Sequence, residues 1–357
     1  MKYRNLGNSG LKVSRIALGS WLTLGNTMDQ GACTVLVEKA FAHGINLFDT
    51  ADVYKRGKKK DAEHGVAEVA LGKAIRDLPR HHVVIATKCF FPLSEDVNDR
   101  GLSRKHVLES CDASLRRLGT DYIDLYQCHR YDPETPLLET ARAMDHLVRQ
   151  GKVLYWGTSS WTAAQITEVA ALCERHGLYA PISNQPVYNL FERGIEAEIV
   201  PASQKVGVGQ IVYSPLAQGV LTGKYVPGEE PPKDSRAGDD RVNKLVGQYM
   251  TPERLELAQK LVALGARVGL SAANLALAFC LANDNIAAVI VGARDKNQLR
   301  EHFKIGDLDV DAAVLDEVRA LFPALAGGSG AGGGWVRDLP VPRHCSRGGR
   351  ASPVAAA

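Results

Sequence analysis

The residues with the clearest chemical potential are Asp49 and Tyr54 in NLFDTADVY, Lys88 at the end of VVIATK, and His129 at the end of YIDLYQCH. Tyrosine has an ordinary pKa of about 10, and a nearby ammonium favours the phenolate, so we expect Lys88 to make the Tyr54 proton easier to release. Asp49 would pair with Lys88, and His129 would hydrogen-bond a substrate oxygen. The set predicts a proton donor for a carbonyl oxygen that becomes an alkoxide, and it requires a separate hydride source.

Each of these four residues also has a plain structural explanation. Asp49 could cap a strand end, Tyr54 could pack on an amphipathic face, Lys88 could be solvated, and His129 could be a satisfied structural histidine. Their joint placement favours a site, because they stand at or just after the ends of consecutive predicted strands. Ionisable groups that converge there are costly unless they pair with each other or with a ligand.

Short apolar segments alternate with longer amphipathic segments along the chain. This alternation indicates a parallel sheet, and eight strands fit one (β/α)8 TIM barrel. A doubly wound sheet is the rival, but its GxGxxG turn is missing after the first strand, where IALGSWLTLGN offers only Gly19 and Gly25. The predicted strands are 15–20, 46–51, 83–88, 122–129, 153–159, 182–188, 209–216 and 287–293. The predicted helices are 31–43, 65–76, 104–118, 137–150, 162–176, 192–205, 272–283, 295–304 and 312–321.

Local signals mark several element boundaries. Ser103, Thr162 and Ser271 stand where helix N-caps are expected, and Gly119 stands where a helix is expected to end. GNSG near the N-terminus predicts a β-hairpin that covers the bottom of the barrel. Since the sites of (β/α)8 barrels lie at the C-terminal ends of the strands, the four reactive residues are expected at the opposite, top face.

Two segments depart from the alternating pattern. Residues 219–250 are rich in proline, glycine and charge and are too long for a plain connection, so we predict a loop at the C-terminal face that is either a functional lid or disordered. Residues 1–323 are predicted to form the barrel domain. Residues 324–357, which contain AGGSGAGGG, are predicted to be a disordered tail.

Composition excludes several classes of protein. The net charge is +3, from 43 basic and 40 acidic side chains, and the tail from Gly327 contributes four arginines and one aspartate. Without the tail the counts become 39 and 39. The rest of the chain therefore gives no reason to expect nucleic-acid binding. No apolar run approaches about 18 residues, so no membrane insertion is expected. The N-terminus has no signal-peptide pattern, and the seven cysteines include no CxxC pair, so we expect a cytoplasmic protein with reduced thiols and no metal site.

The sequence resembles the aldo-keto reductases, and within them the branch of voltage-gated potassium channel β subunits and related bacterial reductases. The resemblance covers roughly residues 1–320 and rests on NLFDTADVY, IATK, YIDLYQCHR, VLYWGTSSW, QPVYNLF, VYSPLAQGVLTGKY and VIVGARDKNQL. It implies a (β/α)8 barrel, NADPH or NADP+ as cofactor, a small-molecule carbonyl substrate, and a catalytic tetrad of Asp49, Tyr54, Lys88 and His129. It leaves a homo-oligomer open.

The resemblance also implies which residues bind the cofactor. Ser159 and Gln185 match the carboxamide-binding pair, and Tyr213 matches the aromatic residue that stacks on nicotinamide. The loop 219–241 is expected to fold over the cofactor. The pyrophosphate loop would comprise Ser214, Pro215, Leu216, Gln218 and Gly219, and the region around adenosine and its 2′-phosphate would comprise Lys224, Arg236, Arg294, Gln298 and Glu301. Gly19, Ser20, Trp21, Asp49 and Gly292 complete the expected cofactor set, and Trp21, Tyr54 and His129 are expected to line the substrate pocket.

Three features differ from the related channel subunits. KKDAEHGV (59–66) is an insertion, His129 replaces an asparagine, and His302 replaces an asparagine near adenine. His129 favours a working reductase over the alternative, a regulatory subunit that binds NADP(H) and turns over slowly. A lyase or isomerase on the same barrel has little support. The five cations between Lys55 and Lys60 are either a solvated loop or a surface that steers an anionic substrate.

Overall fold

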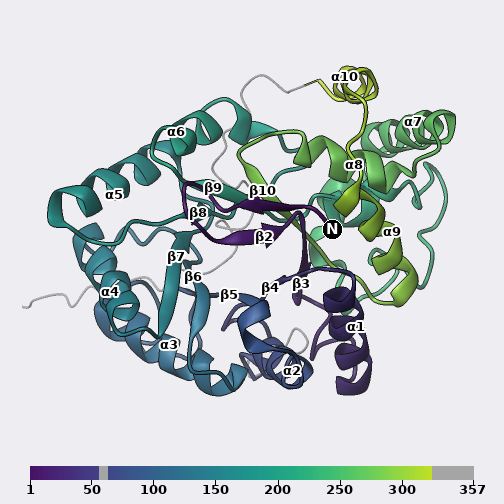
Figure 1. Cartoon of the computed structure of the whole chain (residues 1–357). Helices are drawn as coiled ribbons and strands as arrows, with labels where there is room; N and C mark the ends of the chain where they lie inside the picture. The colour runs from purple at the N-terminus through teal and green to yellow at the C-terminus, as the bar shows by residue number, and fades with distance from the viewer. Residues whose placement is uncertain (56–62, 324–357) are drawn as a thin grey trace, which may run out of the picture.

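Eight parallel strands close into a barrel, as the alternating pattern predicted (Figure 1). The structure is a computed structural model and describes residues 1–55 and 63–323. The strand order around the barrel is β10-β3-β4-β5-β6-β7-β8-β9, so the chain winds once around it and β10 closes against β3. The strands are β3 (Ile16–Gly19), β4 (Leu47–Asp49), β5 (Val84–Cys89), β6 (Ile123–Cys128), β7 (Val153–Thr158), β8 (Ser183–Asn184), β9 (Gly209–Val212) and β10 (Ile286–Val291).

Helices surround the barrel (Figure 1). The predicted caps are confirmed: Ser103 and Ser271 accept backbone N–H groups, and Thr162 forms a capping box with Gln165. Gly119 ends its helix in the left-handed region, at φ 66°. The helices are α1 (Gln30–Ala42), α2 (Val66–Ala74), α3 (Arg104–Leu118), α4 (Leu137–Arg149), α5 (Ala163–His176), α6 (Ile199–Lys205), α7 (Pro252–Val268), α8 (Ala272–Leu281), α9 (Lys296–Asp307) and α10 (Ala312–Leu321).

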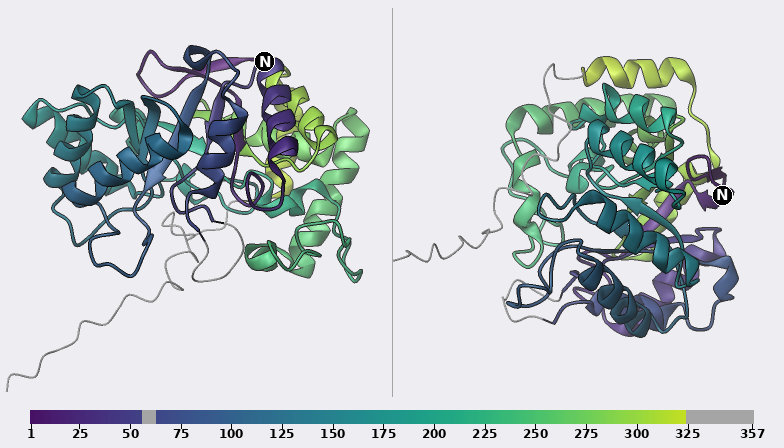
Figure 2. Two further views of the ribbon diagram at one scale, coloured as in Figure 1. Left: turned by 90° about the horizontal axis from the view of Figure 1, so that it is seen from below. Right: turned by 90° about the vertical axis from the view of Figure 1, so that its left-hand side faces the viewer.

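The N-terminal hairpin pairs β1 (Tyr3–Asn5) with β2 (Lys12–Ser14) in antiparallel register. Figure 1 shows it crossing one opening of the barrel, and in Figure 2 it lies at the end opposite the segments that follow β5 and β9. Leu6 and Val13 are buried in one cluster with inward-facing strand residues such as Leu47 and Leu125. The hairpin therefore closes the bottom of the barrel, as predicted, and leaves the other end for a site.

Alternate strand residues supply two apolar layers, because side chains of a strand point to opposite faces. Ala17, Leu47 and Ala86 face the barrel interior, whereas Ile16 and Phe48 belong to the larger cluster between the strands and the helices. Strands buried on both faces explain why the strand segments read as nearly continuous apolar runs.

Three element predictions need correction. The strand predicted at 182–188 is only Ser183–Asn184. The single helix predicted at 192–205 is a 3-10 turn, η2 (Gly194–Glu196), followed by α6, whose third residue is Pro201; proline is tolerated only in the first turn, so the helix starts close to it. The helix α7 was not predicted at all, although Thr251 caps it and Pro252 occupies its first turn.

The long segment after β9 is irregular rather than helical. It contains the 3-10 turns η3 (Ala217–Thr222), η4 (Asn243–Leu245) and η5 (Gly247–Tyr249), and one further 3-10 turn, η1 (Arg80–His82), precedes β5. Within residues 1–55 and 63–323, no single helix is long and apolar enough to span a membrane. Among these residues, only α7 and α8 taken together reach such a length and composition, and a bend of 92° separates them. The predicted tail and the first half of the predicted insertion, residues 59–62, lie outside the described residues.

Candidate active site

Lys88 and Asp49 form a buried ion pair at the C-terminal ends of β5 and β4. The Lys88 ammonium lies 2.8 Å from both Asp49 carboxylate oxygens and 2.7 Å from the Thr50 carbonyl oxygen. Lys88 is fully buried and Asp49 is 4% exposed. Burial lowers the pKa of Lys88, and the Asp49 carboxylate opposes that shift. Asp49 therefore fixes Lys88 in one position, as the sequence predicted.

Tyr54 lies next to this pair. Its hydroxyl is 3.4 Å from the Lys88 ammonium. Burial raises the pKa of Tyr54 well above its ordinary value, and the Asp49 charge raises it further. The expectation that Lys88 would favour the phenolate is therefore wrong for this structure: Asp49 neutralises Lys88 at shorter range, and the buried phenol keeps its proton. Tyr54 is placed to give a proton while neutral, not as a pre-ionised group.

His129 follows β6 and faces Tyr54. The two ring centroids are 6.1 Å apart, in edge-to-face orientation. Burial, followed by the charges of Arg130 and Lys88, lowers the pKa of His129 well below its ordinary value. The imidazole is consequently neutral near pH 7, and its buried Nδ1 has no partner in the described part of the chain. A neutral imidazole can donate or accept one hydrogen bond to a substrate oxygen.

Ser159 and Gln185, the expected carboxamide pair, are joined to the tetrad. The Gln185 side-chain amide donates to Asp49 Oδ1 at 2.8 Å, and Ser159 Oγ donates to the Gln185 carbonyl oxygen at 2.8 Å. Both residues are buried at the ends of β7 and β8. The structure thus brings the ends of β4, β5, β7 and β8 into one polar network.

The expected pyrophosphate loop has an unusual backbone. Ser214, Ala217, Gln218 and Gly219 all have positive φ angles, of 53°, 47°, 60° and 97°. Three of these four are not glycine, and such conformations cost free energy that surrounding contacts must supply. The Gln218 amide donates to Ser214 Oγ at 2.6 Å and so holds the turn closed. Pro215 and Leu216 lie inside this turn.

The first and second strand ends contribute the neighbouring wall. Ser20 is buried, donates its backbone N–H to the Asp49 carbonyl oxygen at 2.9 Å, and has no partner for its hydroxyl in the described residues. A side chain at Gly19 would meet Ile290 at 2.6 Å, so glycine is required there for close packing. Trp21 is half-buried, and the Arg236 guanidinium lies 5.8 Å from its ring. Tyr213, directly after β9, has a buried hydroxyl without a described partner.

Three cations gather beyond this loop. Arg236 donates to the Gln218 side-chain oxygen, and burial followed by the Arg294 charge lowers the pKa of Arg236 to about 10. Burial and the same two arginines lower the pKa of Lys224. This mutual repulsion shows that the cations share one region without full neutralisation. Such a region binds an anion favourably.

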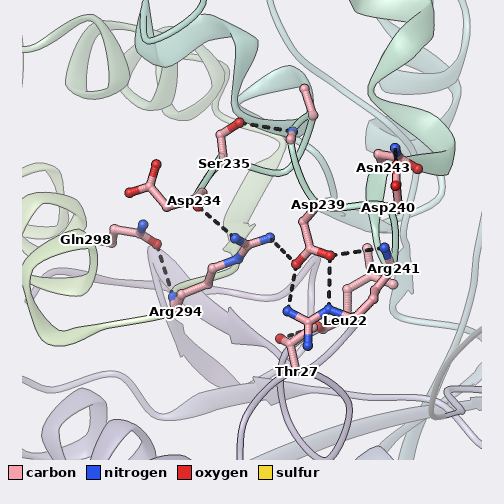
Figure 3. A network of polar contacts seen from close by, with 12 residues as sticks. Leu22, Thr27, Asp234, Ser235, Asp239, Asp240, Arg241, Asn243, Arg294 and Gln298 are labelled. Atoms are coloured by element: carbon pink, nitrogen blue, oxygen red, sulfur yellow. Dashed lines mark hydrogen bonds and ion pairs between the residues drawn. The ribbon is translucent and has the colours of Figure 1, made fainter. Parts of the chain in front are cut away.

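Arg294 ties the segment after β9 to the end of β10 (Figure 3). It donates to the Asp234 carbonyl oxygen at 2.9 Å, and its backbone N–H donates to the Gln298 side chain at 3.0 Å. The nearby Asp239 carboxylate is 4.0 Å away and is already bound by Arg241, at 2.9 Å. The segment therefore lies across the top face, where the sequence placed it.

Two further residues expected near adenosine, Glu301 and His302, differ in whether their side chains already have partners. Glu301 pairs with Lys304 at 2.8 Å. His302 is buried beside the backbone of Gly292, and burial lowers the pKa of His302 to about 4. Its Nδ1 has no partner among the residues that the structure describes.

Sequence reasoning missed three residues of this site. Arg130 and Phe91 border His129, with ring centroids of Phe91 and His129 4.8 Å apart. Asp52 is fully buried, and burial followed by the Glu68 charge raises its pKa well above the ordinary range. The only available signal was position: Arg130 directly follows His129, Phe91 stands three residues after Lys88, and Asp52 lies between Asp49 and Tyr54.

A cavity of about 730 Å³ lies elsewhere, between the C-terminal ends of α2 and α3. Helix C-terminal ends face the bottom of the barrel, away from the tetrad. Its cations Lys73, Arg116 and Arg117 occupy the last turns of these helices, where they stabilise the helix dipoles. In residues 1–55 and 63–323, no group of three or more His, Cys, Asp or Glu side chains could hold a metal ion, and the six cysteines are buried and unpaired.

A (β/α)8 barrel with an acid, a phenol, an amine and an imidazole at consecutive strand ends defines an enzyme-like class of barrel protein. The sequence match is more specific: residues 15–322 match the model of the aldo/keto reductase family, and the chain belongs to this family.

Curated relatives align over most of the chain. A probable voltage-gated potassium channel subunit beta from Oryza sativa subsp. japonica is 41% identical over 326 residues, which cover 90% of this chain and 96% of the relative. A protein of the same description from Arabidopsis thaliana is 42% identical over 323 residues, covering 89% and 95%. A putative voltage-gated potassium channel subunit beta from Schizosaccharomyces pombe is 39% identical over 310 residues, covering 85% and 87%.

Proposed function

We propose that this protein reduces aldehydes or ketones to alcohols with NADPH. The observation that carries the proposal is the buried Lys88–Asp49 pair with the Tyr54 hydroxyl 3.4 Å from Lys88 and His129 facing Tyr54. Membership of the aldo/keto reductase family supports the same reaction class.

The residues present fit a dinucleotide phosphate. Lys224, Arg236 and Arg294 form a cationic region that lacks full neutralisation, which suits the phosphate groups and favours NADP over NAD. The left-handed turn at Gln218 and Gly219 would let a pyrophosphate approach the backbone closely. The buried hydroxyls of Ser20 and Tyr213 have no hydrogen-bond partner in the described residues and could bind the cofactor. Bound there, the cofactor would supply a hydride to the carbonyl carbon.

The chain itself would manage the oxygen and its proton. His129, neutral at pH 7, would hydrogen-bond the carbonyl oxygen and orient it. Tyr54 would donate its proton as negative charge develops on that oxygen. Lys88 would then stabilise the resulting phenolate, because its ammonium is already held beside the hydroxyl by Asp49.

The direct test is a steady-state screen of aldehydes and ketones that follows NADPH absorbance, with NADH alongside. We expect turnover with NADPH and slower turnover with NADH. Absence of reduction across the screen, with folded and cofactor-saturated protein, would overturn the proposal.

A second candidate function is a channel-associated subunit that holds NADP(H) and turns over slowly. The names of the relatives favour it. His129 favours the enzyme, as argued from its sequence position. Turnover near zero together with cofactor that survives gel filtration would favour the subunit. A homo-oligomer stays a prediction, and light scattering would test it. The unpaired cysteines of the described residues, all buried, support a proposal of cytoplasmic location.

A further inference from the structure

Arg130 is a half-buried cation at the edge of the site. It directly follows His129, and its guanidinium lies 5.4 Å from the centroid of the Phe91 ring, which in turn packs against His129. Its charge also affects the tetrad: it lowers the pKa of His129 and acts on the pKa of Tyr54 in the same direction. Arg130 therefore lies close to where a substrate carbonyl would be held.

The hydrogen bonds of Arg130 leave much of its guanidinium free. Nη1 donates to the His129 carbonyl oxygen and to Ser159 Oγ, the latter at 3.4 Å. Both acceptors are neutral. Nε and Nη2 have no acceptor among the described residues, and no carboxylate of those residues lies within 4.0 Å of the guanidinium. One complete donor edge of the fork is thus without a partner.

Asp132, the acidic residue two positions after Arg130, is already engaged. Its carboxylate accepts from the Leu102 backbone at 2.7 Å, from the Glu134 backbone at 3.0 Å and from the Thr135 hydroxyl at 2.7 Å. Partly burying a cation without a counter-charge is unfavourable, so a structural role alone leaves the charge of Arg130 unexplained. A planar fork with a free edge matches a carboxylate.

We propose that Arg130 binds the carboxylate of the substrate, so that the preferred substrates are aldehydo acids or keto acids. This inference rests on the proposed function and specifies its substrate class. The carbonyl oxygen lies between Tyr54 and His129, while the carboxylate lies against the Nε–Nη2 edge of Arg130. Phe91, between His129 and Arg130, contacts the carbon skeleton that joins the two groups. The carboxylate is not altered in the reaction; only the carbonyl gains a hydride and a proton.

The test compares 4-carboxybenzaldehyde with its neutral methyl ester. The variants are Arg130→Met, which keeps an apolar stem without charge, and Arg130→Lys, which keeps the charge without the fork. Arg142→Met is the matched control, because Arg142 is exposed on α4 and has no ion pair within the described chain. Melting temperatures of all variants show whether each one folds.

We expect the unmodified protein to prefer the acid, and Arg130→Met to lower kcat/KM for the acid by about 10- to 100-fold while the ester changes little. The loss should fall mainly on KM, and Arg130→Lys should recover part of it. Calorimetry provides a readout that needs no turnover: benzoate should bind the unmodified protein and bind Arg130→Met about tenfold or more weakly, whereas benzamide should not distinguish them. Arg142→Met should behave as the unmodified protein in both assays.

Equal loss of acid and ester reduction in a folded Arg130→Met would overturn the inference, since Arg130 would then only position the chain around Ser159. Failure of the unmodified protein to prefer the acid would overturn it as well. Failure of the proposed function is distinguishable, because no carbonyl compound would be reduced at all while benzoate binding would still report on Arg130.

Discussion

Gln185 and Asp49, 136 residues apart in sequence, share a hydrogen bond of 2.8 Å between the ends of β8 and β4. Asp49 Oδ1 thereby accepts from Gln185 and from Lys88 at once. The residue expected to hold the nicotinamide carboxamide is consequently part of the same network as the expected proton donor. Cofactor binding and tetrad geometry are therefore expected to respond together to changes at Gln185.

Replacing Gln185 by leucine should weaken both NADPH binding and stability. Loss of its amide leaves one Asp49 acceptor site without a partner, at a cost of about 1–2 kcal/mol in the free energy of unfolding. The dissociation constant for NADPH, measured by fluorescence quenching, should rise about tenfold. Gln30→Leu is the control: it also removes a side-chain hydrogen bond, to the Ala70 carbonyl oxygen at 3.1 Å, but between α1 and α2. A Gln185 variant with unchanged NADPH affinity would separate the two networks.

Tyr54→Phe should abolish carbonyl reduction and preserve NADPH fluorescence quenching. The variant removes one hydroxyl and keeps the ring that packs near His129, so the fold should survive. Kinetics with the best substrate of the screen and cofactor titration measure the two effects. Tyr179→Phe, at a 55% exposed tyrosine, is the matched control and should keep full activity. Full activity of Tyr54→Phe would exclude Tyr54 as the proton donor.

The lowered pKa of His302 predicts that the free energy of unfolding falls in acid. Its pKa is about 4 in the folded protein, because of burial, against about 6.5 when unfolded, so the unfolded state binds more protons between these values. The destabilisation is absent above pH 6.5, grows as pH falls, and reaches about 3 kcal/mol below pH 4. The groups that face His302 are Glu301, Lys224 and the Gly292 backbone.

Denaturant unfolding at several pH values measures this dependence. His302→Asn should flatten the curve between pH 6.5 and pH 4, because asparagine does not titrate. His176→Asn, at an exposed histidine in the last turn of α5, should leave the curve unchanged. Identical slopes for His302→Asn and the unmodified protein would contradict the assignment.

Arg236→Met should reduce the preference for NADPH over NADH. Arg236 belongs to the cationic region with Lys224 and Arg294, and the loss of one charge-assisted contact to a phosphate corresponds to about 10- to 100-fold in affinity. Titrations with both cofactors measure the ratio. Arg175→Met, at an exposed arginine of α5, provides a control of equal charge change. Equal weakening of NADPH and NADH would place Arg236 against the pyrophosphate instead of the 2′-phosphate.

Local signals explain what could be predicted from the sequence. The alternation of strands and helices, the capping box at Thr162 and the helix end at Gly119 depend on neighbours within a few residues, so they are readable without a structure. The helix α7 carries comparable signals, because Thr251 caps it and Pro252 occupies its first turn. The four tetrad positions followed from strand ends, because a closed parallel barrel brings all strand ends to one face.

The tertiary structure alone decided the properties that depend on contact and burial. The hydrogen bond between Gln185 and Asp49 joins groups that are 136 residues apart. The free edge of Arg130 depends on which acceptors surround the guanidinium in space. The direction of the Tyr54 pKa shift also required the structure, because it depends on desolvation and on Asp49 lying closer than Tyr54 to Lys88. Sequence thus determined which groups reach the rim, whereas three-dimensional packing determined their protonation and their partners, since both depend on distances that the order of residues does not contain.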